Sequence, residues 1–489
     1  MSFRNNRVLD FLKKLWPHSH PRRQTHSCTA QISLKGPTSS AYINLLPSEI
    51  LVAEIFPLIL DGSESWPKSI LVLAAVCVKW KSLVHSTPLL WSRCIPIRTW
   101  YLPGSGRPLS NGRLVKKYLT AVGTWLSRSA PLPIPVSLNW YNFQALDEFS
   151  RALSILISAA ARWDSVCINA QSNTEAVTCA FRALARIPEG TFQSLTEVSL
   201  TVSHPRKNGA VEYAKPLLAF MSAPRLRSVR LFGVLPGNTD LVSMPWTQLT
   251  HLSISCPALS CLETLVKCLN VVSAFINCLW WDPSDGPTTL TTTTLRHLET
   301  LRMSVCPGLM DYLGHLNLPA LRTLELFYPD DDDDMVWPFP ESFRQFPLTS
   351  APNLQHLKLS LYGQVLTSPD LCALLRCTPA LTQLDLSGYI CADNGLFDAL
   401  SADVPRTQIL VPRLEILRLY CAIDFDGGSL RAMIASRCQT EDACCVMPLQ
   451  TILFKGVNLF GDNLDPVERD GLEIRLLDPS VLLHVPISQ

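Results

Sequence analysis

The chain has 489 residues, 47% of them hydrophobic and 17% charged, with 42 Lys and Arg residues against 41 Asp and Glu residues. This length predicts several domains or one long repeat array, with enough apolar surface for a core. The net charge of +1 excludes a generally basic nucleic-acid binder and a wholly acidic disordered chain. The charge is uneven, because residues 1–40 are basic and contain a single acid, Asp10.

Residues 1–40 mix Pro, Ser, Thr, His and Arg without sustained periodicity, which predicts a disordered basic leader. A short amphipathic piece with Val8, Phe11, Leu12 and Leu15 leaves a mitochondrial presequence open as an alternative. Two prolines and three histidines directly after this piece favour the leader.

Residues 44–91 predict a compact helical unit. Pro47 suits a first helical turn, where its missing N–H has no partner, and Glu49 suits the positive end of the helix dipole. Two apolar stripes occur at helical spacing. The first consists of Leu51, Ile55, Leu58 and Ile59, and the second of Leu73, Val76, Cys77, Trp80 and Val84. Pro88 ends the second stripe. So small a unit buries little by itself, so we expect it to pack on the rest of the chain or on a partner.

The order of residues in 46–91 resembles an F-box. The matching pieces are Leu46-Pro47-Ser48-Glu49-Ile50-Leu51, Ile55-Phe56, Val76-Cys77 with Trp80, and Thr87-Pro88-Leu89-Leu90-Trp91-Ser92. The family pattern runs L-P-x-E-I-L, I-F, V-C-x-x-W and often P-x-L-W. The chain departs from it in a long loop, Asp61–Ser69, and in Val78, where the family usually has a basic residue. The alternative is an ordinary helical hairpin that caps the remainder of the chain.

Two later pieces extend the resemblance to F-box proteins of mushroom-forming fungi. They are Trp125-Leu126-Ser127-Arg128-Ser129 and Arg162-Trp163-Asp164-Ser165-Val166.

Beyond about residue 130 the phrase Leu-x-x-Leu-x-Leu recurs. The clear copies are Leu195/Val198/Leu200, Leu226/Val229/Leu231, Leu249/Leu252/Ile254, Leu298/Leu301/Met303, Leu321/Leu324/Leu326, Leu354/Leu357/Leu359, Leu381/Leu384/Leu386 and Leu414/Leu417/Leu419. Weaker copies are Val136/Leu138, Val166/Ile168, Val271/Ala274/Ile276 and Leu449/Ile452/Phe454. Five copies open with Pro-x-Leu, where a proline ends the preceding segment before a strand.

This loose period predicts a leucine-rich-repeat solenoid, in which each repeat adds a short strand and stacks on its neighbours. The predicted fold class is therefore α/β, with a small N-terminal helical F-box followed by a horseshoe of irregular leucine-rich repeats. An α/β domain with unrelated parallel strands is the alternative. The expected domains are 1–40 (leader), 41–95 (F-box), 96–130 (helical linker or solenoid cap), 131–460 (solenoid) and 461–489 (tail or cap).

Side chains interleaved with the repeat leucines are expected on the opposite, concave face of the strands. The candidate target-binding residues are Arg230, Phe232, His251, Arg302, Glu325, Phe327, Lys358, Asp385, Arg418 and Tyr420. Their mixed signs and aromatic rings suit a protein partner better than a phosphate backbone. Because every solenoid has such a face, the loops and the C-terminal tail stay open as binding sites.

Seventeen cysteines include no Cys-x-x-Cys pair and no cysteine–histidine pair at zinc-finger spacing, so we expect reduced thiols in a cytoplasmic or nuclear protein. The longest apolar run, Ile70–Val78, is too short to span a bilayer, and no membrane association is expected. Asp330–Asp334 is interpreted as a solvated loop, and His251 near Cys256 and Cys261 fits no metal pattern. Nucleotide-binding, zinc-protease and serine-hydrolase motifs are missing, so no cofactor, metal or catalytic residue is predicted.

The F-box resemblance implies a non-catalytic substrate receptor of an SCF-type cullin-RING ubiquitin ligase. The module would bind a Skp-family adaptor, and through it a cullin scaffold, while the solenoid would hold an unknown target protein. The residues that the resemblance assigns to adaptor contact are Leu46, Pro47, Ile50, Leu51, Ile55, Phe56, Val76, Cys77 and Trp80. Some of these must instead hold the module together. The alternative is a leucine-rich interaction scaffold unrelated to ubiquitin transfer.

Overall fold

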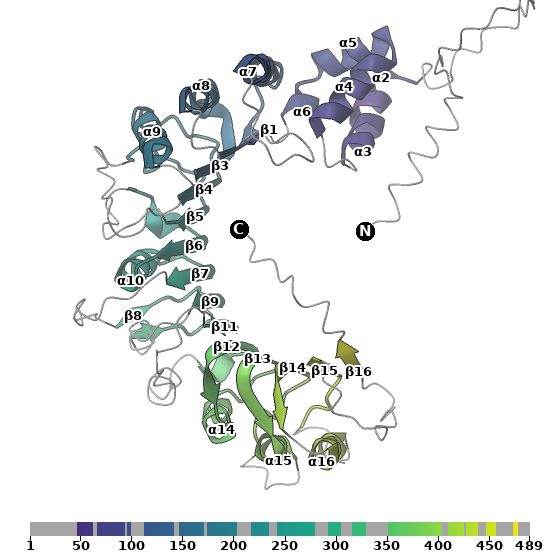
Figure 1. Ribbon diagram of the computed structural model, residues 1–489, viewed down its shortest axis with the longest axis vertical. Helices are drawn as coiled ribbons and strands as arrows, with labels where there is room; N and C mark the ends of the chain where they lie inside the picture. Colours follow the sequence, from purple (N-terminus) through teal and green to yellow (C-terminus); the bar gives the residue numbers. More distant parts are fainter. Residues whose placement is uncertain are drawn as a thin grey trace, which may run out of the picture. The chain divides into compact units, whose positions relative to one another are not determined.

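A computed structural model gives the fold (Figure 1). The described residues are 46–61, 66–92, 95–98, 112–140, 146–170, 174–202, 217–233, 242–278, 292–304, 315–328, 351–402, 409–424, 427–438, 446–455 and 473–477. The predicted leader at 1–40 and the acidic run Asp330–Asp334 lie outside these residues. No helix within them is long and apolar enough to cross a bilayer.

The chain divides into two compact units. The first comprises Met1–Pro96, Tyr101–Val136 and Arg162–Asp164, and the second comprises Ile97–Trp100, Ser137–Ala161 and Ser165–Gln489. Three strands, β1 (Ile95–Arg98), β2 (Ile134–Trp140) and β3 (Trp163–Ala170), begin in the first unit and end in the second.

The first unit is helical. Its elements are α2 (Ser48–Ile50), a π-helical turn (Leu51–Ile55), α3 (Phe56–Asp61), α4 (Trp66–Val76), α5 (Val78–Ser86), α6 (Pro88–Trp91) and α7 (Gly112–Arg128). Pro47 directly precedes α2, and its carbonyl accepts a hydrogen bond from Leu51 N–H at 3.2 Å. The compact helical unit predicted for this part of the chain is therefore present.

The second apolar stripe does not form one continuous helix. Cys77 has an extended backbone and separates α4 from α5. Its thiol accepts a hydrogen bond from Trp80 N–H at 3.4 Å, so the sulfur caps the start of α5. The break lets α4 and α5 fold against each other while both direct apolar residues into one core.

The second unit alternates strands with helices or irregular segments. Its helices are α8 (Leu146–Ile157), α9 (Thr174–Leu184), α10 (Ala258–Lys267), α14 (Ser368–Arg376), α15 (Asn394–Leu400) and α16 (Gly427–Cys438). After β3 its main strands are β4 (Glu197–Val202), β5 (Ser228–Phe232), β6 (His251–Cys256), β7 (Ser273–Cys278), β9 (Thr300–Ser304), β11 (Thr323–Phe327), β12 (His356–Leu366), β13 (Gln383–Asp393), β14 (Ile416–Asp424), β15 (Thr451–Lys455) and β16 (Glu473–Leu477). Strands β8 (Thr293–Thr294) and β10 (Leu316–Asn317) form a separate small parallel pair. Short 3-10 turns lie at Ala160–Arg162, Trp246–Gln248 and Ala351–Asn353.

From β3 onward the main strands lie side by side in chain order, and each neighbouring pair is parallel. The helices lie along one side of this row of strands (Figure 1). A mixed α/β fold with a long parallel sheet, consistent with a repeat solenoid, is therefore confirmed. Even the weak copies of the phrase coincide with strands, because β2, β3, β7 and β15 contain the last two apolar residues of each copy.

The repeat leucines form the core of the second unit. Leu324, for example, pairs in register with Leu301 on one side and Leu357 on the other, and all three are fully buried. The first leucine of each phrase is buried as well, as Leu321 and Leu354 illustrate. Stacking of equivalent apolar side chains supplies the core that no single repeat could form alone.

The parallel sheet extends into the segment 461–489, whose role the sequence left open between a cap and a loose strand. Strand β16 pairs with β15, and Ile474 lies opposite Ile452.

Candidate protein-binding surfaces

The helical unit has a closed apolar core. Its buried members are Leu51, Phe56, Leu60, Ile70, Leu73, Trp80, Val84, Leu90 and Trp91. Phe56 and Trp80 meet edge to face, with their ring centroids 4.9 Å apart. The core draws on the π-helical turn and on helices α3 to α6, which explains why the segment forms one compact body.

A large set of apolar side chains in the same unit remains exposed. They are Ile50, Leu58, Leu71, Val72, Val78 and Leu89. The exposed fractions run from 43% for Ile50 to 85% for Val78. Scattered single exposed leucines are normal in proteins, but six in a helical segment of this length are more than that expectation accounts for. This set is called the open apolar set below.

The structure divides the predicted adaptor-contact residues into three groups. Leu51, Phe56 and Trp80 are buried in the core, so their side chains hold the module together. Leu46, Ile55, Val76 and Cys77 are half-buried and pack against that core. Pro47 and Ile50 are exposed. The other members of the open apolar set were not assigned to adaptor contact, although Leu58 belongs to the first predicted stripe.

Helix α5 also carries the basic residues Lys79, Lys81 and His85. Lys79 Nζ donates a hydrogen bond to the Leu46 carbonyl at 3.0 Å, which ties α5 to the start of the module. Partial burial, with the charges of Arg128 and Lys81, lowers the pKa of His85. The module surface therefore combines apolar and basic side chains.

Helix α7 is attached to the module through tryptophans. Trp125 Nε1 donates a hydrogen bond to the Trp91 carbonyl at 2.6 Å, and the two indole rings meet edge to face at 5.0 Å. The Arg128 guanidinium lies 4.6 Å from the centre of the Trp91 ring. Arg162 then donates to the carbonyls of Leu126 and Leu132. The two sequence pieces noted after the F-box-like segment thus join α7 to this unit.

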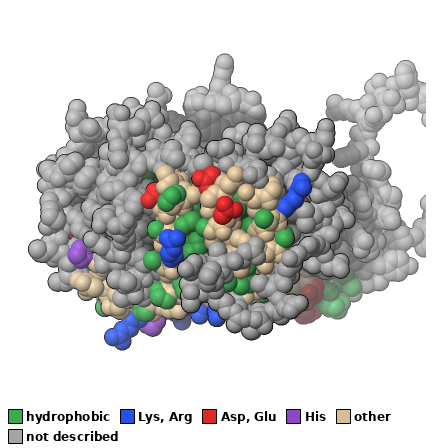
Figure 2. All heavy atoms as spheres, turned by 90° about the horizontal axis from the view of Figure 1, so that it is seen from below, with side chains coloured by type: hydrophobic (Ala, Val, Ile, Leu, Met, Phe, Trp, Pro, Cys, Tyr) green, Lys and Arg blue, Asp and Glu red, His purple; other side chains and the backbone are tan. Residues whose placement is uncertain are grey.

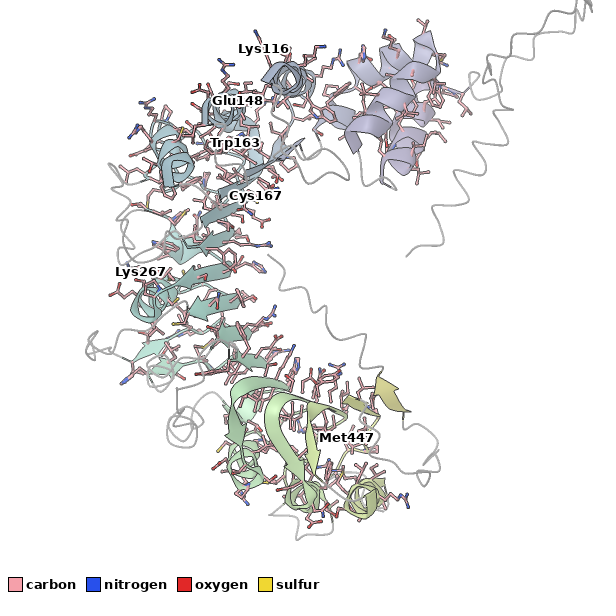
Figure 3. All side chains as sticks on the ribbon, in the orientation of Figure 1. Lys116, Glu148, Trp163, Cys167, Lys267 and Met447 are labelled. Atoms are coloured by element: carbon pink, nitrogen blue, oxygen red, sulfur yellow. The ribbon has the colours of Figure 1, made fainter. Side chains whose placement is uncertain are left out.

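In the second unit, side chains also project from the strands on the side away from the helices (Figure 3). The strand register arranges them in two rows. The register places one residue of each strand in the first row, called the outer row: Arg230, Ser253, Phe275, Arg302, Glu325, Lys358, Asp385 and Arg418. From Arg302 to Arg418 the charges alternate in sign along this row. The second row holds Phe232, Ser255, Asn277, Ser304, Phe327, Ser360, Ser387 and Tyr420.

Most charges of the outer row pair with one another. Arg302 Nε lies 2.9 Å from a Glu325 carboxylate oxygen, and Arg418 lies 3.1 Å from Asp385. Arg230 pairs instead with Glu197, at 3.2 Å. Of the predicted target-binding cations, Lys358 is the exception: no ion pair within 4.0 Å is found for it among the described residues.

Asp385 is the most enclosed charge of the outer row. Burial by itself would raise the pKa of this carboxyl, but hydrogen bonds from His356 and Gln383 and the charge of Arg418 outweigh burial, so the pKa lies below its usual value. The His356 ring and the Asp385 carboxylate are 3.4 Å apart. Burial raises the pKa of the neighbouring Tyr420 hydroxyl, which stays protonated at neutral pH.

Three phenylalanines meet on the same face. Phe275 stacks on Phe327 with ring centroids 5.8 Å apart, and Phe232 lies 6.3 Å from Phe275 on its other side. The Arg302 guanidinium lies 5.5 Å from the centre of the Phe275 ring. The structure thus brings together the predicted residues Phe232, Arg302, Glu325 and Phe327. Phe275 was missed, although aligning Val271/Ala274/Ile276 with the other copies would have put it in the outer row.

Not all of the predicted target-binding set belongs to this cluster. His251 is exposed at the start of β6, where its ring contacts Thr250 at 2.9 Å. Tyr420 lies on β14, beside the Asp385–Arg418 pair.

Figure 2 shows the end of the second unit near α14, α15 and α16, where apolar, acidic and basic side chains are interspersed.

Within the described residues no group of His, Cys, Asp and Glu side chains is arranged to hold a metal ion. Cys256 and Cys261 are buried with their sulfur atoms 3.1 Å apart, whereas His251 is exposed. Burial raises the pKa of nearby Cys268 to about 12, so this thiol stays protonated.

No protein-family model and no curated protein sequence matches the chain. Among solved structures, the chain is similar to a chain in the crystal structure of the Rad7 and Elc1 complex in yeast. The two chains are 14% identical, the match covers 84% of this chain and 98% of that chain, and the TM-score is 0.35. This chain is also similar to a protein from Bacteroides fragilis, with 9% identity, 63% of this chain and 86% of that chain covered, and a TM-score of 0.25. At such TM-scores the likeness supports no functional conclusion.

Proposed function

We propose that the chain is the substrate-recognition subunit of an SCF-type cullin-RING ubiquitin ligase. Its helical module, which resembles an F-box, would dock a Skp-family adaptor and through it a cullin. The leucine-rich strand array would bind a target protein. The observation that carries the proposal is the open apolar set, which lies outside the closed core of the module.

Apolar side chains in water cost free energy that a partner can recover. Covering apolar surface contributes about 25 cal/mol per Å². Val78, Leu71 and Val72 are each more than half exposed, so they offer area without any rearrangement of the core. A Skp-family adaptor would supply the covering surface.

The chain itself would contribute positioning rather than chemistry. By holding a target near a conjugating enzyme carried by other subunits, it would raise the effective concentration of target lysines. No nucleophile, metal or cofactor of this chain enters the proposal. We propose the cytoplasm, the nucleus or both as the place of action.

The test is co-expression with a Skp-family adaptor from the same organism, followed by co-purification. We expect the full chain to retain the adaptor and the double variant Ile50→Asp/Val78→Asp to lose it, because two carboxylates would be buried at the interface. The matched control is Met221→Asp/Leu269→Asp, which changes residues of the second unit that are 52% and 49% exposed. This control should bind the adaptor as well as the unchanged chain does.

Failure of the full chain to bind any adaptor would overturn the proposal and favour an interaction scaffold unrelated to ubiquitin transfer. Equal binding by the Ile50/Val78 variant would show that the open apolar set is not the docking surface. The variant Pro47→Ala/Ile50→Ala tests the exposed residues of the F-box-like motif with a milder change, because it removes side-chain area without introducing a charge.

A further inference from the structure

Between Arg302 and Arg418, the outer row contains one more positive charge than negative charges. The row reads Arg302, Glu325, Lys358, Asp385 and Arg418, so three cations face two carboxylates. Each carboxylate already has an arginine partner, at 2.9 Å for Glu325 and 3.1 Å for Asp385. The excess charge therefore resides at Lys358, in the middle of the row.

Aromatic and small side chains flank Lys358 in the second row. Phe327 is on β11, the strand before the one that carries Lys358. Ser360 is on β12 together with Lys358, Ser387 is on β13, and Tyr420 is on β14. The Ser387 hydroxyl donates to the Ser360 hydroxyl at 2.7 Å, so these two serines are hydrogen-bonded to each other. The register thus places a cation beside two small polar residues, between two aromatic ones.

The stacked Phe275 and Phe327 rings lie on one side of this cation. Both rings are only half-buried, and the pair has Arg302 against its edge. Phe327 and Lys358 lie on adjacent strands, which are about 4.8 Å apart in a sheet. Lys358 and Phe327 also lie in different rows, so they are offset along the strands. An extended peptide rises about 3.3 Å per residue, so about two to three of its residues span the distance between the two side chains.

We infer that the target segment is an extended peptide with an acidic side chain that pairs with Lys358 and an apolar or aromatic side chain, two or three residues away, that packs on Phe275 and Phe327. The charge complementarity at Lys358 selects an acidic ligand, and the ring pair selects the apolar neighbour. This inference rests on the proposed function insofar as the bound peptide belongs to a ligase target.

The test uses the full chain and a library of nine-residue peptides in which one position is fixed as Asp, Lys or Ala and another as Phe or Ser. Binding is read by fluorescence polarisation. We expect selection of Asp with Phe at a spacing of two or three. Lys358→Gln should weaken that binding by about tenfold or more, because a charge-assisted hydrogen bond is lost. Lys358→Glu should shift the preference from Asp to Lys peptides.

Two controls keep the outcome decisive. Arg413→Glu makes the same charge reversal at an exposed cation for which no ion pair is found among the described residues, and it should leave binding unchanged. Phe275→Ala should abolish the preference for Phe over Ser while keeping that for Asp. No selected peptide, equal binding of Asp and Ala peptides, or an equal effect of Arg413→Glu would overturn the inference.

Adaptor binding measured on the same preparations separates the two proposals. A chain that binds the adaptor but selects no acidic peptide loses only the inference about Lys358. A chain that selects the peptide but binds no adaptor keeps this surface and loses the ligase assignment.

Discussion

The helical module and the strand array treat their apolar residues in opposite ways. In the array, each repeat is covered by the next, so leucines such as Leu357 and Leu384 are fully buried and the outer row is charged. In the module, a few short helices close one core and leave Val78 and Leu71 in water. Repetition lets the array complete its own apolar packing, whereas the module leaves six large apolar side chains exposed.

The largest expected effect comes from the module core. Trp80→Ala removes a ring that is 3% exposed and packed on Phe56, and we expect a loss of about 3–5 kcal/mol in the stability of the module. Hydrogen exchange read by mass spectrometry should rise across residues 46–92. Protection of the array strands β11 to β14 is the internal control. If those strands lost protection equally, the two regions would not be independently stable.

The next effect tests packing between repeats. A Cβ at Gly388 would lie 2.0 Å from the Leu361 carbonyl oxygen, and the backbone has φ +90°. We expect Gly388→Ala to destabilise the array by about 2–4 kcal/mol, measured by urea unfolding followed by hydrogen exchange. Gly190→Ala is the matched control, because Gly190 has φ +79° with nothing within 4 Å of the added Cβ. It should cost about 1 kcal/mol. Equal effects would contradict the close approach at Leu361.

A smaller effect is expected from the paired charges of the outer row. Asp385→Asn weakens the contacts with His356 and Arg418, and we expect a loss of about 1–3 kcal/mol at pH 7. The folded-state pKa of Asp385 lies below its ordinary value of 3.8, so its contribution is complete above that pH and is lost as the pH falls through the folded-state value.

The pH dependence checks this assignment. The unfolding free energies of the unchanged chain and of Asp385→Asn should differ by a constant amount between pH 5 and 7, and the difference should shrink as the pH falls below 3.8 through the folded-state pKa. A gap that persists at lower pH would show that packing, rather than the carboxylate charge, makes Asp385 stabilising.

The smallest expected effect sharpens the contrast between the module's core and its surface. Val78→Ser changes a residue that is 85% exposed, so the stability of the module should stay within about 0.5 kcal/mol. Differential scanning fluorimetry of the full chain measures this. A marked loss of stability would mean that Val78 already packs on its own chain, and the open apolar set would no longer indicate a partner.

The sequence was most informative about the array. The spacing of the repeat leucines located strands β4 to β7, β9 and β11 to β15, because a buried apolar position every second residue fixes which residues form the core. The pairing of Asp385 with Arg418 was also within reach, since aligned copies place them in one row. The stacking of Phe275 on Phe327 skips a strand, so that contact depends on side-chain orientations that the repeat phrase does not encode.

The sequence was less informative about the module. Periodicity grouped Cys77 and Trp80 in one helical stripe, but an extended backbone at Cys77 divides that stripe into two helices. Periodicity likewise could not separate the buried residues Leu51 and Phe56 from the exposed residue Ile50. The motif described which residues recur, and only their packing shows which of them face water.

The contact between Trp91 and Trp125 has a practical consequence for anyone who excises the N-terminal part. A fragment cut at residue 95 would strip the Trp91 ring of its indole neighbour and of the Arg128 cation above it. A fragment that ends at residue 136 keeps both neighbours, so we expect it to resist unfolding better than the fragment that ends at residue 95.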